Sequence, residues 1–284
     1  MNIVVFGGSG YIGRNLLTST TLSEYHTLLS PQSSGTDGVD LLNVKSVERL
    51  FSHNQFDLVI NCAAVLPHNR ISPDFQLNVE GSANIVSSLR RSGQSIPIVH
   101  LSSATEMIYD PHCESPYSQS KLVGFQKLKD LAAEFETPII RIILHNVVGR
   151  NPNHRGLINE LINSAMKDWG FYLKFPSRRR DFVWIDDCVS AINSIVRRVS
   201  ATSLLNELPL LSTYEIGTGR ATTLYEIACK VFLMFGSSTN RITIEQQSDD
   251  VFLENVADLS NPNTLRCETN IDELLKLLFR ERNS

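Results

Sequence analysis

The stretch MNIVVFGGSGYIG, residues 1–13, decides the fold of this 284-residue chain. Its apolar run stops at three glycines that are spaced three apart, Gly7, Gly10 and Gly13. A strand that ends in a glycine-rich turn, which then opens a helix, places backbone N–H groups and the positive helix end where a pyrophosphate can sit. Glycines also serve ordinary tight turns, so the spacing alone is weak evidence, but its position after the first strand favours nucleotide binding.

Apolar runs of strand length alternate with helical patterns through the first half of the chain. The predicted pairs are Ile3–Phe6 with Gly10–Thr18, His26–Leu29 with Val44–His53, and Leu58–Asn61 with Pro73–Arg91, followed by strands at Ile98–Leu101 and Ile139–Leu144 on either side of a helix at Ser118–Phe135. This alternation favours a doubly wound parallel α/β sheet, because each crossover must return over a face of the sheet.

The alternation loosens after about residue 150, where Asn151-Pro152-Asn153 breaks the chain. We therefore predict a first domain at residues 1–150, with contributions from about 180–220. A smaller lobe, residues 151–284, is expected to be interleaved with it. The stretch Ser30–Gly38, SPQSSGTDG, is the most loop-like part of the chain.

Composition and charge exclude several classes of protein. Hydrophobic residues make up 42% of the chain, and apolar runs such as Val231 to Phe235 are far shorter than a membrane span. The net charge of −4 gives no general attraction to phosphate backbones, so we expect neither a nucleic-acid nor a membrane partner. The N-terminal residues lack the pattern of a secretion signal, which favours a cytoplasmic protein. The five cysteines show no metal-ligand spacing, so we expect reduced thiols and no metal site.

Eight segments, in order, resemble the extended short-chain dehydrogenase/reductase family, in its NAD-dependent epimerase/dehydratase branch, which acts largely on nucleotide sugars. The segments are GGSGYIG at 7–13, DLVINCAA at 57–64, NVEGSANI at 78–85, VHLSSAT at 99–105, YSQSK at 117–121, NVVGR at 146–150, RDFVWIDD at 180–187 and YEIGTGRATTLYEIA at 214–228. The resemblance implies a Rossmann-type sheet with a smaller C-terminal substrate-binding lobe, an NAD or NADP cofactor and a nucleotide-diphosphate sugar as the substrate. It also implies a homodimer formed through two helices, one of which carries Tyr117.

The resemblance implies cofactor contacts along the glycine loop and beyond it. The cofactor-binding residues are then Gly7, Gly10, Tyr11, Ile12, Gly13, Arg14, Ala63, Ala64, Tyr117 and Lys121. The acidic residue that usually binds the adenosine ribose about 20 residues downstream is absent, because Leu29-Ser30-Pro31-Gln32 is neutral and Asp37 and Asp40 lie too late. The small polar side chains of this stretch leave room for a 2′-phosphate, and Arg14 can pair with it, so the sequence favours NADP. The alternative for Arg14 is a solvated arginine on the surface of its helix.

Tyr117 and Lys121 lie four residues apart in a predicted helix, so both side chains share one face. A free tyrosine, with a pKa of about 10, is a poor acid or base at neutral pH. A lysine ammonium, helped by an oxidised nicotinamide, lowers that pKa, so we expect a lowered pKa for Tyr117. Ser103 is predicted at the carboxyl end of the fourth strand, where its hydroxyl can hold a substrate oxygen. By resemblance, Ser103, Tyr117 and Lys121 are the catalytic residues, and Ser102 is the neighbour that competes with Ser103.

Supporting residues are implied in the same way, each with a plainer alternative. Asn146 and Arg180 match positions that approach the sugar's diphosphate; the alternatives are a loop-capping amide and a surface salt bridge. Asn78 is expected to tie its helix to the sheet through hydrogen bonds, and the alternative is a hydrogen bond within the helix. Asp186-Asp187 is expected to cap the next helix rather than to form a paired-carboxylate site.

The residues after Ser103 narrow the reaction. Related dehydratases carry Asp-Glu there, whereas this chain has Ala104 and Thr105, with Glu106 displaced by one position. A 4,6-dehydratase is therefore not expected. The leading hypothesis is reduction of a 4-keto-deoxyhexose by hydride transfer, with tyrosine as the acid, which the short segment between Ser103 and Tyr117 also favours. The alternatives are a nucleotide-sugar 4-epimerase, a reductase of a non-sugar carbonyl, and a non-catalytic dinucleotide-binding regulatory protein.

Overall fold

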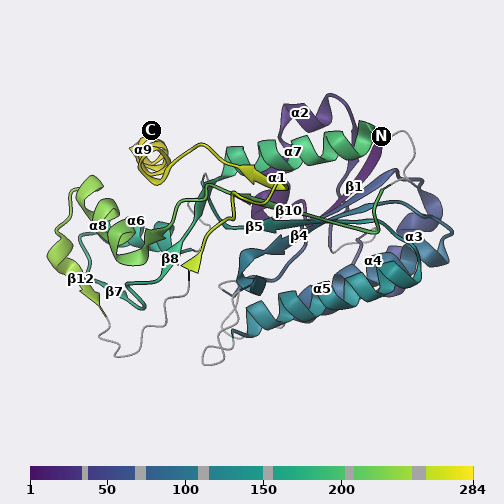
Figure 1. Ribbon diagram of the computed structural model, residues 1–284, viewed down its shortest axis with the longest axis horizontal. Helices are drawn as coiled ribbons and strands as arrows, with labels where there is room; N and C mark the ends of the chain where they lie inside the picture. Colours follow the sequence, from purple (N-terminus) through teal and green to yellow (C-terminus); the bar gives the residue numbers. More distant parts are fainter. Residues whose placement is uncertain are drawn as a thin grey trace. The chain divides into compact units, whose positions relative to one another are not determined.

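The computed structural model describes residues 1–33, 38–67, 75–107, 115–149, 156–201, 208–244 and 254–283. The strands of its main sheet are β1 Asn2–Phe6, β2 Thr27–Leu29, β3 Leu58–Asn61, β4 Ile98–Ser103, β5 Ile139–Leu144, β10 Leu211–Gly217 and β14 Thr264–Arg266. Their order is β14-β10-β5-β4-β3-β1-β2 (Figure 1). The sheet is parallel, which confirms the predicted Rossmann-type doubly wound architecture.

The chain forms two compact units. The first contains Met1–Leu144 and Val189–Tyr214, and the second contains His145–Cys188 and Glu215–Ser284. The sequence-based boundary at residue 150, including the break at Asn151-Pro152-Asn153, falls outside the described residues, so the predicted domain division stays a prediction. Part of the loop-like stretch Ser30–Gly38 also falls outside them.

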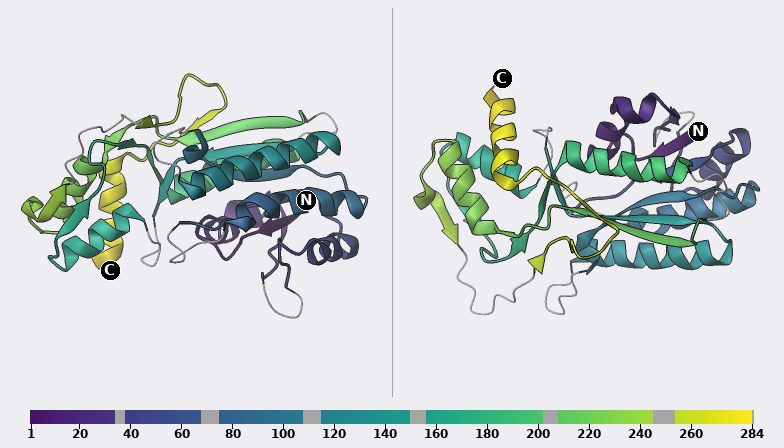
Figure 2. Two further views of the ribbon diagram at one scale, coloured as in Figure 1. Left: turned by 90° about the horizontal axis from the view of Figure 1, so that it is seen from below. Right: turned by 45° about the horizontal axis from the view of Figure 1, so that its top comes forward.

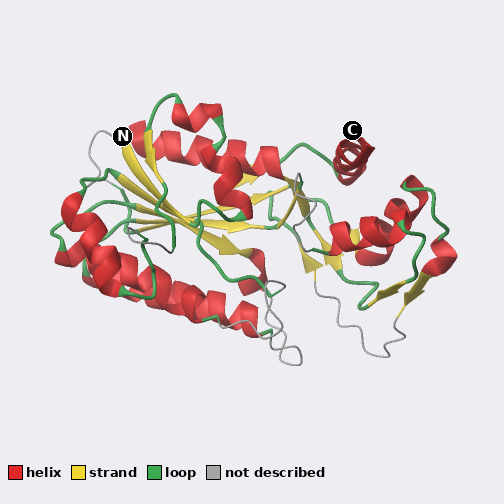
Figure 3. Ribbon diagram, turned by 180° about the vertical axis from the view of Figure 1, so that it is seen from behind, coloured by secondary structure: helices red, strands yellow, loops and turns green. Residues whose placement is uncertain are grey.

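Helices cover both faces of the sheet in the first unit. They are α1 Tyr11–Leu17, α2 Thr20–Ser23, α3 Val44–His53, α4 Gln76–Arg91, α5 Pro116–Glu134 and the part of α7 Ile185–Ala201 that begins at Val189. Helices α3, α4 and α5 lie on one face, and α7 lies on the other (Figures 1 and 3). The core beneath the first group includes Phe6, Phe51, Ile85 and Leu128, all buried.

Helix α5 begins two residues earlier than the sequence pattern predicts. The hydroxyl of Ser115 accepts a hydrogen bond from the N–H of Ser118, and Pro116 occupies the first turn. A serine at the N-cap with a proline at the first helical position favours a helix start there, because the proline lacks an N–H that would need a partner.

Helices α4 and α5 run side by side, as both views of Figure 2 show. They approach closely at Gly124 of α5, where an added Cβ would lie only 2.0 Å from the carbonyl oxygen of Asn78 on α4. The absence of a side chain at Gly124 therefore sets the spacing of the two helices.

Among its described residues, the second unit contains short strands and complete helices. Its elements are β6 Asn146–Val148, α6 Leu157–Met166, β7 Phe171–Leu173, β8 Arg179–Arg180, β9 Phe182–Trp184, β11 Thr222–Thr223, α8 Leu224–Met234, β12 Ile242–Ile244, β13 Glu254–Asn255 and α9 Ile271–Asn283. The strands pair as β11-β8-β13, β12-β7 and β6-β9. Strands of two or three residues carry too little alternation to be predicted from sequence, which is why these pairings were not expected.

Candidate active site

The glycine loop after β1 lies tightly against the segment that follows β3. Gly7 has φ of +77°, which favours glycine, and a Cβ there would lie 2.6 Å from the backbone nitrogen of Ala63. A Cβ at Gly13 would lie 2.3 Å from the carbonyl oxygen of Gly7, and the N–H of Gly10 donates to that same oxygen at 2.9 Å. Side chains at Gly7 or Gly13 would therefore force the loop apart.

The start of α1 fits a phosphate group. Gly10 is the N-cap residue, it is exposed, and no side chain caps the helix at this position. The first-turn N–H groups, which include those of Tyr11 and Ile12, are thus not covered by a capping side chain. Together with the tight loop, this gives a backbone surface that can take the pyrophosphate of a dinucleotide.

Two polar side chains flank the loop where a dinucleotide's adenosine half is expected. Arg14 is exposed, and its Nη2 donates to the carbonyl oxygen of Ser9 at 3.0 Å. Ser30, just after β2, lies against Gly8, whose added Cβ would be 2.0 Å from the Ser30 Oγ. Arg14 is therefore folded back onto the loop rather than extended into solvent.

Buried amides hold the backbone after β3. The Oδ1 of Asn61 accepts from the N–H of Ala63 at 3.1 Å, so it fixes the chain just before Ala64. The side chain of Asn78 bonds both the N–H and the carbonyl of Val65, at 2.8 and 3.0 Å. Its Nδ2 also donates to the Ser120 hydroxyl of α5 at 3.0 Å. Asn78 thus joins α4, α5 and the segment after β3, in line with the structural role expected for it.

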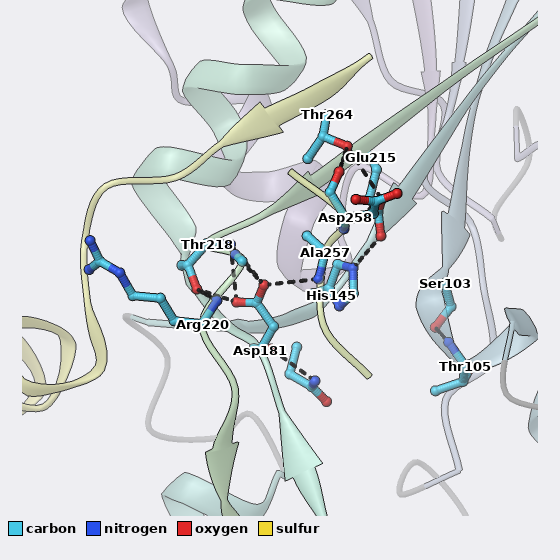
Figure 4. A network of polar contacts seen from close by, with 12 residues as sticks. Ser103, Thr105, His145, Asp181, Glu215, Thr218, Arg220, Ala257, Asp258 and Thr264 are labelled. Carbon is cyan, nitrogen blue, oxygen red and sulfur yellow. Dashed lines mark hydrogen bonds and ion pairs between the residues drawn. The ribbon is translucent and has the colours of Figure 1, made fainter. Parts of the chain in front are cut away.

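Ser103, Tyr117 and Lys121 come together at the carboxyl end of β4. Ser103 is the last residue of β4, and its hydroxyl lies 2.9 Å from that of Thr105, as Figure 4 shows. Tyr117, in the first turn of α5, is half-buried, and its phenol lies close enough to the Ser103 hydroxyl for that hydroxyl to stabilise the phenolate. Lys121 lies one turn further along α5, and its Nζ donates to the carbonyl oxygen of Leu101 at 3.1 Å.

Burial has the largest effect on the pKa values of Tyr117 and Lys121. It raises the pKa of Tyr117 above its usual value, with a further increase from the Glu106 carboxylate, while the hydrogen bond with Ser103 acts in the opposite direction. The expected lowering of the Tyr117 pKa is therefore wrong for this structure, because the desolvation of the phenolate outweighs the favourable contacts. Burial also lowers the pKa of Lys121.

The hydroxyl of Ser102 contacts a buried ion pair that was not expected from the sequence. This hydroxyl donates to the Glu106 carboxylate at 2.7 Å, and the Nη2 of Arg141 contacts the same carboxylate at 2.5 Å. The side chain of Glu106 is fully buried, and that of Arg141 is 15% exposed. The signal in the sequence is Arg141 itself, a charged residue inside the apolar run Ile139–Leu144.

Asn146 and Arg180 belong to the second unit, where Asp181 links them. The N–H and the Nδ2 of Asn146 both donate to the carbonyl oxygen of Asp181, at 3.1 and 3.0 Å. Arg180 is half-buried, its Nη1 donates to the carbonyl of Arg179, and burial together with the charge of Arg178 lowers its pKa. The fully buried carboxylate of Asp181 accepts from the N–H groups of Thr218, Gly219 and Ala257 (Figure 4).

A second buried contact in this unit joins His145 and Glu215, with 2.7 Å between His145 Nε2 and a carboxylate oxygen (Figure 4). Burial acts to raise the pKa of Glu215, but the contact with His145 and hydrogen bonds from the Asp258 N–H and the Thr264 hydroxyl outweigh it, so the pKa falls below its usual value. This contact was not expected from the sequence, where Glu215 inside the strand pattern YEIG is the signal of a buried polar group.

Other expectations concern acidic residues, cysteines and membrane segments. Asp186 and Asp187 lie in the first turn of α7, and Asp187 accepts from the N–H of Thr269 at 3.0 Å.

In the described ranges, no group of three His, Cys, Asp or Glu residues is placed to hold a metal ion. Cys62, Cys188, Cys229 and Cys267 are free thiols, while Cys113 lies outside those ranges. No helix in the described part of the chain has the length and apolar character to cross a bilayer.

The chain is similar in sequence and in fold to known proteins. The sequence profile of the NAD dependent epimerase/dehydratase family matches residues 3–206. The UDP-2-acetamido-2,6-beta-L-arabino-hexul-4-ose reductase of Pseudomonas aeruginosa is 24% identical over 233 residues, which is 80% of this chain but only 57% of the reductase's length. The GDP-6-deoxy-D-talose 4-dehydrogenase of Aggregatibacter actinomycetemcomitans is 23% identical over 241 residues, or 80% of this chain and 78% of the dehydrogenase.

Among solved structures, the fold is similar to that of the UDP-glucose 4-epimerase of Thermus thermophilus in complex with NAD. The TM-score is 0.76 at 19% identity, and the match covers 100% of this chain and 99% of the epimerase chain. At this identity the likeness establishes the fold alone.

Proposed function

The chain belongs to the NAD dependent epimerase/dehydratase family and is therefore an enzyme that uses a nicotinamide dinucleotide, and from this premise we propose that it reduces a 4-keto-deoxyhexose carried on a nucleoside diphosphate. The observation that carries the proposal is the meeting of Ser103, at the carboxyl end of β4, with Tyr117 and Lys121 of α5. This is the edge of a doubly wound sheet at which ligands bind.

The chemistry assigned to these residues follows from their environment. A bound nicotinamide dinucleotide supplies the hydride. Tyr117, whose raised pKa keeps the phenol protonated at neutral pH, gives its proton to the sugar's carbonyl oxygen as that oxygen gains negative charge. The Ser103 hydroxyl holds the same oxygen in place, while Lys121 fixes the start of α5 against β4 through Leu101.

The choice of substrate is supported by the two relatives and by the second unit. Both relatives are named for nucleotide sugars, and both names place the redox chemistry at carbon 4. Arg180 offers a guanidinium that suits a diphosphate, and Asn146 is held beside it through Asp181. Ala104 and Thr105, in place of an acid pair, disfavour elimination of water.

The proposed cofactor is NADP. Ser30, directly after β2, takes the place of an acidic residue, and Arg14 lies beside the glycine loop, where its guanidinium can move from the Ser9 carbonyl to a 2′-phosphate. The proposed assembly is a homodimer through α4 and α5, supported by Leu122 and Val123 of α5, which are 51% and 52% exposed. Light scattering coupled to size-exclusion chromatography measures the assembly, and a monomer would contradict it.

The test of the reaction uses purified protein with NADPH or NADH and a panel of UDP-, GDP- and dTDP-linked 4-keto-deoxyhexoses. The expected result is oxidation of the reduced cofactor, faster with NADPH, together with a 4-hydroxy product. Failure to oxidise either cofactor with every sugar would contradict the proposal. Interconversion of 4-hydroxy epimers with no net change in the cofactor would instead identify a 4-epimerase.

A further inference from the structure

A buried ion pair lies directly behind the proposed catalytic residues. Glu106, on the 3₁₀ turn Ala104–Met107 after β4, contacts Arg141 of β5 at 2.5 Å, and we call these two residues the Glu106–Arg141 pair. The Arg141 guanidinium also lies over the ring of Phe125, 3.8 Å from its centroid, and its Nε donates to Ser102 at 3.1 Å. The pair is thus held from three sides.

The carboxylate of this pair reaches the backbone of Ser103. One oxygen of Glu106 accepts from the Ser103 N–H at 3.1 Å, and both oxygens accept from the Ser102 hydroxyl at 2.7 Å. Ser103 is the residue whose hydroxyl meets Tyr117. A change in the position of Glu106 is therefore transmitted through one peptide group to the hydroxyl that holds the substrate oxygen.

A buried ion pair is costly, since both charges lose water, and well-packed apolar residues of similar size are often at least as stable. Packing alone therefore gives no reason for a charged pair between β5 and the turn after β4. We propose that the Glu106–Arg141 pair is a positioning pair for catalysis: Glu106 fixes the Ser103 backbone and places a negative charge behind Tyr117 and Lys121, and Arg141 holds that charge in place.

The charged and titratable groups around the pair come from four elements. Tyr117 and Lys121 face it from α5, His100 lies on β4, Arg141 on β5, and Cys62 follows β3. The Glu106 carboxylate raises the pKa of both Tyr117 and Lys121, whereas Arg141 lowers that of Lys121. Burial keeps His100 neutral by lowering its pKa, and it raises the pKa of Cys62 to about 12. In the neutral range, the pair therefore supplies the charges that act on Lys121.

This inference rests on the proposed reduction, so its first test uses the pH profile of that reaction. In Glu106→Gln, the amide places a donor against Arg141, and the negative charge behind Tyr117 is lost. At alkaline pH, kcat is expected to fall as Tyr117 loses its proton. In Glu106→Gln, this alkaline limb of the pH profile of kcat is expected to move to lower pH by about one unit. We expect kcat at the optimum to fall roughly tenfold to hundredfold, because the Ser103 hydroxyl is less well placed, with the KM for NADPH little changed.

The double variant Glu106→Gln with Arg141→Met separates positioning from stability. Glu106→Gln alone leaves the Arg141 charge buried without its partner, and the thermal midpoint is expected to fall. The double variant removes both charges, so the thermal midpoint is expected to recover while the alkaline limb stays displaced. The proposal is overturned if the alkaline limb of the double variant returns to its wild-type pH together with the thermal midpoint. It is also overturned if the alkaline limb does not move in either variant. If Glu106→Gln does not fold, the double variant alone decides, through the position of its alkaline limb.

Glu80→Gln is the matched control, because Glu80 forms a partly exposed ion pair with Lys127 between α4 and α5. Glu80→Gln should leave both the pH of the alkaline limb and the kcat at the optimum unchanged. If the wild-type protein reduces none of the sugars, the proposed function fails, and the pair is then tested through the ¹³Cζ resonance of Tyr117, assigned by its loss in Tyr117→Phe. An earlier onset of its titration in Glu106→Gln supports the inference, and an unchanged onset contradicts it.

Discussion

Asp181 and Thr218 are joined through both the backbone and the side chain of the threonine. The Thr218 N–H reaches the two carboxylate oxygens at 3.1 and 2.9 Å, and its hydroxyl donates to one of them at 2.6 Å. Since the carboxylate also accepts from Gly219 and Ala257, a single buried anion fixes three segments of the second unit.

In the variant Asp181→Asn, an NH₂ group replaces one of the two side-chain oxygens that accept hydrogen bonds. This donor then faces backbone N–H groups, which lose their acceptor. Leaving buried N–H groups without an acceptor costs about 1–3 kcal/mol, so the thermal midpoint should fall by several degrees. Under the proposed function, the KM for the nucleotide sugar should rise more than that for NADPH, because a shift of the Asp181 backbone moves Asn146, which its carbonyl oxygen holds, and the neighbouring Arg180. Asp130→Asn, at an exposed site on α5, is the control and should change neither quantity.

Replacing the phenol of Tyr117 tests its role as the acid. Tyr117→Phe should lower kcat by about 10²–10⁴-fold, since the proton donor is lost, while the Kd for NADPH measured by fluorescence stays within a few-fold of wild type. Tyr225→Phe, at an exposed tyrosine of α8, should behave like wild type. Full activity in Tyr117→Phe would remove the residue from the mechanism. A wild-type protein that binds the dinucleotide without turnover would point to a regulatory role.

Glu215 should give the protein a stability that disappears in acid. Its pKa in the folded state is below the usual value of about 4.3, so its stabilising effect is present above that pH and is lost as the pH falls through the folded-state pKa. Urea unfolding of Glu215→Gln should show a clear loss of stability at pH 7 and a smaller difference from wild type below pH of about 4. Glu268→Gln, in an exposed ion pair, is the comparison. A difference that grew in acid would contradict the assignment.

The spacing of α4 and α5 should not tolerate a methyl group at position 124. Gly124→Ala places a carbon 2.0 Å from the Asn78 carbonyl oxygen, so the helices must separate, at a cost of roughly 1–3 kcal/mol. Gly170→Ala, where the nearest atom would be 3.6 Å away, should stay within about 0.5 kcal/mol of wild type. Equal stability of the two variants, measured by urea unfolding, would show that α4 and α5 adjust without cost.

Arg14 should separate the two cofactors. If it pairs with a 2′-phosphate, Arg14→Gln should raise the KM for NADPH about tenfold or more and leave that for NADH nearly unchanged. Arg49→Gln, at an exposed position on α3, controls for the loss of a surface charge. An equal effect on both cofactors would exclude the 2′-phosphate as the partner of Arg14.

The alternating part of the fold is readable from the sequence because each element carries its own pattern. The predicted ranges Val44–His53, Leu58–Asn61 and Ile139–Leu144 coincide with α3, β3 and β5. The same local reading placed Ser103 at the end of β4, and the YxxxK spacing placed Tyr117 and Lys121 on one helix. These features depend on residues that are near one another in the chain.

Contacts between distant residues escaped that reading. Glu106 and Arg141 are 35 residues apart, and His145 and Glu215 are 70 apart, so no local period connects them. The direction of the Tyr117 pKa was missed for a related reason: the sequence shows the neighbouring lysine but not the depth of burial. The sequence contains one indication of these contacts, a charged residue among apolar neighbours in a strand, as at Arg141 and Glu215. Such a residue predicts a buried polar contact but does not identify the partner.

The contact between Ser30 and Gly8 bears on how this enzyme's cofactor preference can evolve or be engineered. A side chain at position 30 starts with its Cβ only 3.0 Å from where a Cβ of residue 8 would be, and so grows along the glycine loop itself. Under the proposed NADP preference, an aspartate introduced at position 30 to select NAD would have to share that space with the loop. We therefore expect a change of preference to need coordinated substitutions at Ser30 and in the glycine loop rather than a single mutation.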